Sequence, residues 1–195
     1  MFFVLGNPRS GTSLLRLLLT SHSHVHIPPE CGHMIWWTKD YADWSWARDA
    51  GRLDDYLTDL FSSKKFEFWE LSREDLSAFI HARQPRDYAA LAMCVYEFHQ
   101  SVAGKTGTIG DKNNFHVNHV DDLAQMFPDA KFVHIVRDGR DVAMSYLDMA
   151  KVKSTSAFKP NLPKTMTEIA GEWGGNVARV GADLSKLDVG RYVEI

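Results

Sequence analysis

The start of the chain joins a short apolar run, a loop bounded by glycines and a leucine-rich segment. These form the stretch FFVLGNPRSGTSLLRLLL, which begins at Phe2. An apolar run that ends in glycine is typical of a buried parallel strand. The leucine-rich segment has the length and composition of a helix. Strand, glycine loop and helix in this order predict the first unit of a βα-type fold.

The loop itself resembles a phosphate-binding loop with one substitution. Gly6 and Gly11 keep the G-x-x-x-x-G spacing and Ser13 keeps the hydroxyl, but Thr12 stands where nucleotide hydrolases place a lysine. Backbone N–H groups of such a loop converge at a helix N-terminus, where an anion is favoured. Arg9 adds a guanidinium that suits phosphate or sulfate oxygens. The alternative is an ordinary glycine-rich turn between a strand and a helix.

The rest of the chain alternates apolar strand-like runs with helical periodicity. A second short strand is expected in HVHIPPE before Pro28, because proline cannot continue a central ladder. Further strands are expected in GTIGDK, KFVHIV and RYVEI. Helices are expected from Pro85 to Val102, in VDDLAQMFPDA, after Arg137 and over 166–187. In the last of these, glycines weaken the helical pattern. The segment 151–163 reads as a polar loop.

This alternation predicts one α/β domain over residues 1–195, of the three-layer P-loop type with a mainly parallel central sheet. The aromatic and charged stretch of about residues 31–110 predicts an inserted helical cap. A chain that starts directly on a core strand is expected to begin where its domain begins.

Composition excludes several classes of function. The net charge of −3 gives no general electrostatic support for binding nucleic acid or a membrane surface, so an anion must be held by a local cluster. No apolar run reaches the ~20 residues that span a bilayer, and a basic signal region is absent. The two cysteines, Cys31 and Cys94, do not make a disulfide framework. A cytoplasmic location is expected.

A second cluster of polar residues lies in VRDGRDVAMSY. Arg137 follows the clearest buried strand, and Ser145 comes eight residues later in the next expected helix. Ligands of open parallel sheets bind outside the carboxyl ends of the strands, so both side chains fit such a crevice. A solvated run of charges before a helix is the alternative.

Together, GNPRSGTS and RDGRDVAMS resemble the sulfotransferases that use 3′-phosphoadenosine 5′-phosphosulfate (PAPS), and the bacterial and tyrosylprotein branches in particular. The resemblance implies a modified loop without the usual lysine that holds the 5′-phosphosulfate, while the arginine and the serine eight residues on hold the 3′-phosphate. The cofactor-binding residues that it implies are Arg9, Ser10, Gly11, Thr12, Ser13, Arg137 and Ser145.

The same resemblance implies three catalytic residues. Glu30 in HIPPECG matches a general base that takes a proton from the acceptor; a carboxylate at a helix N-terminus is the alternative. Lys112 in GDKNNF matches a lysine near the bridging oxygen, where its charge stabilises the leaving group; a surface lysine is the alternative. Arg9 stabilises charge on the transferring group. Asp111 is read as an orienting partner.

No metal is expected. His22, His24 and His26 alternate, but no cysteine pair completes a closed zinc site. Trp36, Trp37, Trp44 and Trp46 are read as core and cap packing, with the lining of an apolar acceptor pocket as the alternative. Trp173 is read as a core residue.

The predicted activity is the transfer of a sulfuryl group from PAPS to a hydroxyl or amine of a small molecule, carbohydrate, lipid or peptide. The alternatives are a P-loop kinase or NTPase, which needs Mg²⁺ and ATP, and a non-catalytic nucleotide-binding module. The family usually continues past a strand such as RYVEI with a segment that covers the nucleotide, so its C-terminal part is expected to be missing after Ile195.

Overall fold

The computed structural model describes residues 1–151 and 163–195 of the chain. Five parallel strands form its central sheet, in the order β2-β3-β1-β4-β5. The strands are β1 (Phe2–Leu5), β2 (Val25–His26), β3 (Thr108–Lys112), β4 (Lys131–His134) and β5 (Tyr192–Glu194). Helices flank the sheet, which confirms the predicted α/β fold. The expected polar loop of 151–163 lies almost entirely outside the described residues.

The central position of β1 follows from its composition. Three of its four residues are fully buried, and it pairs with β3 on one side and β4 on the other. The chain therefore crosses from one side of β1 to the other between β3 and β4. At such a switch in strand order, the crevice outside the carboxyl ends of the strands is the usual place for a ligand. The loop after β1 opens into this crevice.

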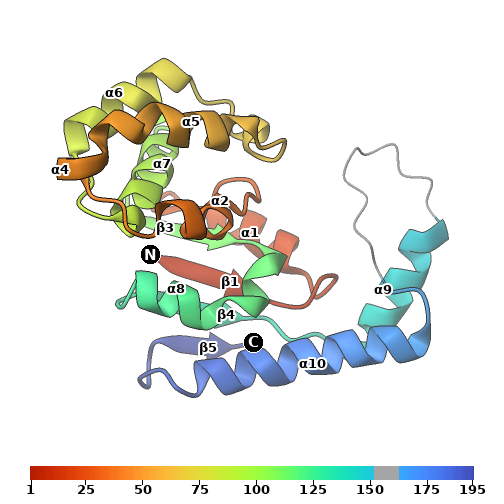
Figure 1. Cartoon of the computed structure of the whole chain (residues 1–195). Helices are drawn as coiled ribbons and strands as arrows, with labels where there is room; N and C mark the ends of the chain where they lie inside the picture. Colours follow the sequence, from red (N-terminus) through yellow and green to blue (C-terminus); the bar gives the residue numbers. More distant parts are fainter. Residues whose placement is uncertain (152–162) are drawn as a thin grey trace.

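The helices around the site are α1 (Thr12–Thr20), α8 (Val120–Met126), α9 (Gly139–Lys151) and α10 (Met166–Leu184), together with the 3₁₀ turn η3 (Asn114–Asn118). In Figure 1 the arrow of β1 points toward α9, and α10 runs along the β5 side of the sheet. A capping box starts α10: Thr165 and Glu168 each accept an N–H of the other. The helix continues without interruption through Gly171 and Gly174.

A helical cap stands beyond the opposite, β3 side of the sheet (Figure 1). It comprises α2 (His33–Trp36), α3 (Thr38–Tyr41), α4 (Trp46–Asp49), η1 (Ala50–Arg52), α5 (Leu53–Ser62), η2 (Phe66–Trp69), α6 (Arg73–Arg83) and α7 (Tyr88–Val102). The cap confirms the expected insertion, although the expected limit near 110 falls within β3.

The start of α7 corrects one expectation. The helix begins at Tyr88 rather than at Pro85, because Asp87 is its N-cap: the extended Asp87 accepts the N–H of Ala90 through Oδ1 at 2.8 Å. A side-chain cap of this kind fixes a helix start more strongly than the preference of proline for the first turn.

The main hydrophobic core extends through the sheet, the cap and the helices α8 and α10. It joins strand residues such as Phe3 and Phe132 to cap residues such as Leu57, Ile80 and Tyr96. A smaller cluster lies between α9 and α10, and its buried members are Val142, Ala143, Tyr146 and Ile169.

Tryptophans pack much as expected. Trp44 is buried, and Trp37 and Trp46 pack against the main core, whereas Trp36 is exposed. Trp173 is half-buried and packs against the smaller cluster between α9 and α10.

Candidate functional site

The loop between β1 and α1 has a backbone conformation that favours glycine at some positions and is strained at another. A side chain at Gly6 would meet Ile135 and Thr12 at 2.8 Å, so the loop packs directly against the segment after β4. Gly11 has φ +97°, a left-handed conformation that favours glycine, and it is the N-cap of α1. Arg9 adopts φ +73°. A non-glycine residue in this region stores strain of the kind found at ligand sites.

Arg9 links the loop to the second cluster. Its Nε donates to Ser145 Oγ at 3.0 Å, and its carbonyl accepts from Arg137 Nη1 at 3.2 Å. Arg137 also lies 3.7 Å from Asp141, one turn along α9. The two clusters, far apart in the sequence, therefore lie against each other at the carboxyl end of the sheet.

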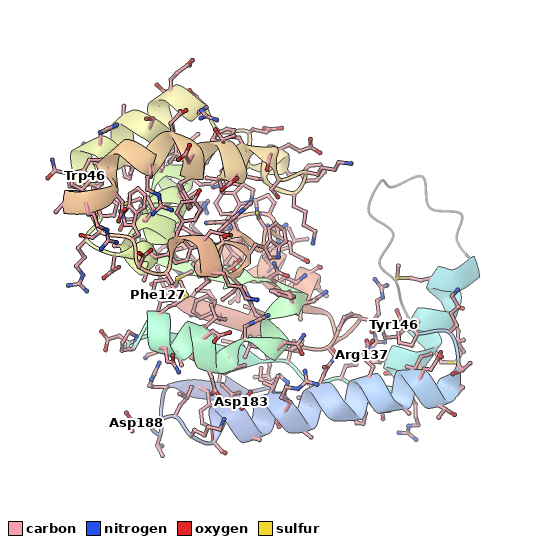
Figure 2. All side chains as sticks on the ribbon, in the orientation of Figure 1. Trp46, Phe127, Arg137, Tyr146, Asp183 and Asp188 are labelled. Carbon is pink, nitrogen blue, oxygen red and sulfur yellow. The ribbon has the colours of Figure 1, made fainter. Side chains whose placement is uncertain are left out.

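Side chains of α10 form hydrogen bonds with the second cluster and with α9. Trp173 Nε1 donates to the carbonyl of Arg137 at 3.0 Å, and Tyr146 donates to Glu172 Oε1 at 2.5 Å. Burial and the Glu172 carboxylate raise the pKa of Tyr146 above its usual value, so the phenol stays protonated. Figure 2 labels Arg137 and Tyr146 at the end of the molecule where α9 meets α10.

Glu30 lies between two ammonium groups. Lys112 Nζ is 2.8 Å from its Oε2, and Lys65 Nζ is 3.0 Å from its Oε1. The side chain of Lys112 is only 3% exposed, against 30% for Glu30. Burial by itself raises the pKa of Glu30, but the charges and hydrogen bonds of the two lysines outweigh it, so the net pKa lies below the usual value. The carboxylate is ionised at neutral pH.

The register of the sheet explains the place of Lys112. It pairs with Val4, one residue before the end of β1, and therefore lies at the carboxyl end of the sheet, next to the loop between β1 and α1. Asp111 precedes it and therefore points to the other face of β3. There Asp111 bonds the buried His116 at 2.5 Å. On that face Asp111 is a partner of His116, and its role as an orienting residue stays a prediction.

One cavity of about 440 Å³ collects most of the expected site residues. It is lined by Pro8, Arg9, Gly11, Thr12, Ser13, Glu30, Asn114, Arg137, Ser145 and Met149. Lys112 is not among these lining residues, but it contacts Glu30, which is one of them. Ser10 is buried, and its N–H donates to the carbonyl of Asn7 at 3.1 Å, which closes the turn of the loop.

Two site residues were missed by the sequence analysis. Asn114 lines the cavity, and its Oδ1 accepts from Thr12 Oγ1 at 3.1 Å. Its position two residues after Lys112 is the only sequence signal for it. Lys65 lies far from every motif in the sequence, and no pattern points to it.

The comparisons with known proteins agree with this geometry. A model of the sulfotransferase family matches residues 2–195. The chain belongs to the sulfotransferase family. A comparison with curated proteins found no match.

Three solved sulfotransferases share the fold. One is the sulfotransferase domain from the Curacin biosynthetic pathway (19% identity, TM-score 0.57). Another is the sulfotransferase domain from the Synechococcus PCC 7002 olefin synthase (19% identity, TM-score 0.62). A third is the sulfotransferase STF9 from Mycobacterium avium (15% identity, TM-score 0.51). The matches cover 100% of this chain but 66%, 65% and 58% of those chains, respectively. This chain thus spans about two thirds or less of their length.

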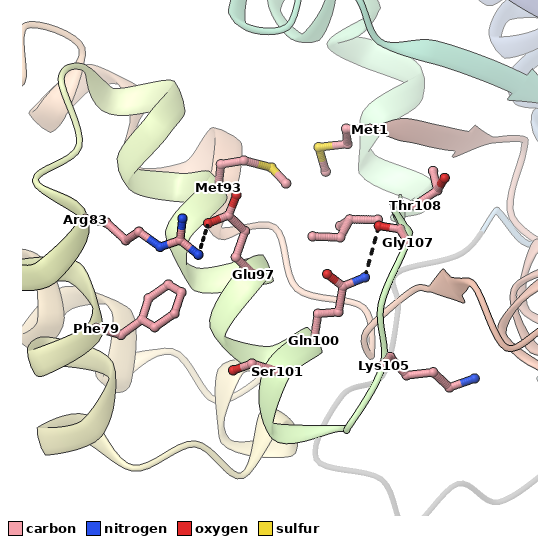
Figure 3. Close-up of a pocket in the computed structure, with 11 residues that line it drawn as sticks. Met1, Phe79, Arg83, Met93, Glu97, Gln100, Ser101, Lys105, Gly107 and Thr108 are labelled. Carbon is pink, nitrogen blue, oxygen red and sulfur yellow. Dashed lines mark hydrogen bonds and ion pairs between the residues drawn. The ribbon is translucent and has the colours of Figure 1, made fainter.

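A second cavity of about 550 Å³ lies at the other ends of the strands, between α6, α7 and the start of β3. Figure 3 marks two interactions among the residues that line it. Arg83 and Glu97 pair at 3.6 Å, and Gln100 donates to the carbonyl of Gly107 at 3.3 Å. Lys105 donates to two backbone carbonyls outside the cavity.

Two further absences concern the described part of the chain. Within residues 1–151 and 163–195, no three histidine, cysteine or acidic side chains are grouped so that they could hold a metal ion. Across the same ranges, no helix is long and apolar enough to cross a membrane.

Proposed function

We propose that this sulfotransferase transfers a sulfuryl group from PAPS to a hydroxyl or amine of an acceptor. One observation carries the proposal: a single cavity is lined by the phosphate loop, by Arg137 and Ser145, and by the Glu30 carboxylate. The loop and the Arg137–Ser145 pair are two groups that suit anions, and Glu30 is a base beside the same space. This arrangement fits a sulfuryl donor that carries negative charge at both ends.

The residues present fit PAPS. Arg9 and Arg137 bring two guanidiniums to the cavity, and the N-terminus of α1 carries no acidic residue in its first turn. Helix amides and guanidiniums favour phosphate and sulfate oxygens. The lysine that grips ATP in nucleotide hydrolases is replaced by Thr12. When bound, PAPS supplies a sulfuryl group on a good leaving phosphate.

The binding roles follow from these positions. Arg9, Thr12 and Ser13 hold the 5′-phosphosulfate, together with the amide of Gly11, while Ser10 keeps the loop in shape. Arg137 and Ser145 hold the 3′-phosphate. The hydrogen bond between Arg9 and Ser145 supports the binding of one nucleotide by both groups, because it joins the two ends of the site.

Glu30 takes the proton of the acceptor. A carboxylate must be ionised to act as a general base, and the two lysines keep it so at neutral pH. Lys112 stabilises the charge that develops on the leaving oxygen. It belongs to β3, which pairs with β1, the strand directly before the loop. The cap lies beside Glu30 and selects the acceptor, which is a small molecule, carbohydrate, lipid or peptide.

Calorimetric titration with PAP, the product nucleotide, tests the donor assignment. We expect PAP to bind without Mg²⁺ and Mg·ATP to bind at least tenfold more weakly. Binding of Mg·ATP alone would favour a P-loop kinase or NTPase, and binding of neither would favour a non-catalytic module. Mass spectrometry of candidate acceptors incubated with PAPS then identifies sulfated products.

A further inference from the structure

The two lysines on Glu30 come from different parts of the molecule. Lys112 belongs to β3 and is buried, whereas Lys65 belongs to the cap, between α5 and η2, and its side chain is 31% exposed. Each ammonium occupies one carboxylate oxygen, at 2.8 and 3.0 Å. Glu30 is therefore fixed from the sheet on one side and from the cap on the other.

The cap holds Lys65 in place through its aromatic neighbours. Phe66 is buried and packs against Phe61 with ring centroids 5.0 Å apart. Trp69, at the end of η2, donates its Nε1 to the carbonyl of Pro29 at 2.9 Å. This bond ties the turn that carries Lys65 to the residue directly before Glu30. The contact is thus built into the fold on both sides and is more than a chance pairing of surface charges.

The charges that face Glu30 explain why a second lysine is needed. Lys112 and Lys65 contact it, and Arg9 and Arg137 line the same cavity. In the proposed reaction Lys112 stabilises charge on the leaving oxygen. The interaction with that oxygen draws the Lys112 ammonium away from the Glu30 carboxylate. Of these two lysines, Lys65 then remains in place to hold Glu30 toward the acceptor.

We propose that Lys65 is a positioning residue, supplied by the cap, that holds the Glu30 carboxylate in its proton-accepting orientation. The inference rests on the proposed role of Glu30 as the base.

The test compares Lys65→Met, which keeps most of the aliphatic stem and removes the charge, with Lys65→Arg, which keeps the charge. Lys64→Met is the matched control, since Lys64 is the adjacent, exposed lysine and the Glu30 oxygens are bonded to Lys65 and Lys112 instead. Carboxyl carbon NMR of labelled glutamate follows the titration of Glu30 directly, without turnover. Lys65→Gln is a second neutral variant in case Lys65→Met does not fold.

We expect the pKa of Glu30 to rise in Lys65→Met and to stay near the parent value in Lys65→Arg and Lys64→Met. The acidic limb of the kcat profile moves to higher pH by the same amount, and PAP affinity stays within twofold. A Glu30 pKa that is equal in Lys65→Met and Lys64→Met would overturn the inference. So would a shifted pKa with an unmoved acidic limb. Failure of the parent to bind PAP would count against the donor assignment, and the NMR titration would still decide whether Lys65 acts on Glu30.

Discussion

Glu30 Oε2 and Lys112 Nζ lie 2.8 Å apart although 82 residues separate them in the sequence. The ion pair joins the segment after β2 to the end of β3, next to the phosphate loop. It also accounts for a lysine that is almost wholly buried. Glu30 is thus both the candidate base and the carboxylate that pairs with the buried Lys112.

Glu30→Gln should separate these two roles. Loss of a general base lowers kcat by about 10²–10⁴-fold. Loss of the counter-ion leaves Lys112 buried without a carboxylate, so the free energy of unfolding falls by about 1–3 kcal/mol, less than for a fully buried pair because Glu30 is partly exposed. Steady-state kinetics and urea denaturation measure the two effects. Unchanged kcat would exclude Glu30 as the base.

Arg137→Ala should weaken PAP binding by ~1.5–3 kcal/mol, the scale of a hydrogen bond to a charged group. Calorimetry measures the loss. Arg140→Ala is the matched control, because Arg140 is exposed and pairs with Asp138 outside the cavity. Equal affinities for PAP in the two variants would remove Arg137 from the 3′-phosphate site.

Stability should fall as the pH drops from about 6.5 to about 4. His26 Nε2 and His99 Nδ1 lie 2.7 Å apart, and burial lowers the pKa of both, that of His99 to about 4. The unfolded chain binds protons from pH 6.5 downward while the folded pair resists them, so acid favours unfolding. Urea denaturation across this range measures the slope. His99→Gln should make the slope shallower, and an identical slope would contradict this account of the pair.

Gly174→Ala should stabilise the fold by about 0.5–1 kcal/mol, because alanine is the better helix former. Among the described residues, a Cβ at Gly174 meets nothing within 4 Å. Gly110→Ala is the contrasting variant, since its Cβ would overlap the ring of Phe2. Thermal melts distinguish the two. Destabilisation by Gly174→Ala would mean that α10 needs a glycine for a reason other than space.

Local patterns made the glycine-bounded loop after β1 and the strands predictable. The loop from Gly6 to Ser13 carries its own signal in glycine spacing, and the buried strands show as apolar runs. Glu30 is different: an isolated carboxylate after two prolines gains a role only through the family resemblance. Which residues meet it depends on tertiary contacts.

The parts that escaped prediction depend on packing between distant segments. Lys65 reaches Glu30 across 35 residues because of how the cap folds, and no periodicity encodes that. The leucines of α1 show the same limit in another way. They predict a helix correctly, yet Leu14, Leu17 and Leu18 are exposed. Composition gives the type of an element more readily than the face that it buries.

The central claim is that one nucleotide contacts both clusters at once. Following the side-chain N–H signals of Arg9 and Arg137 by NMR during a titration with PAP tests it most directly. We predict that both signals shift along one binding curve with a single Kd, and that the Nε–H of the exposed Arg140 does not shift. A shift of only one of the two arginines, or two curves with different Kd values, would contradict the account.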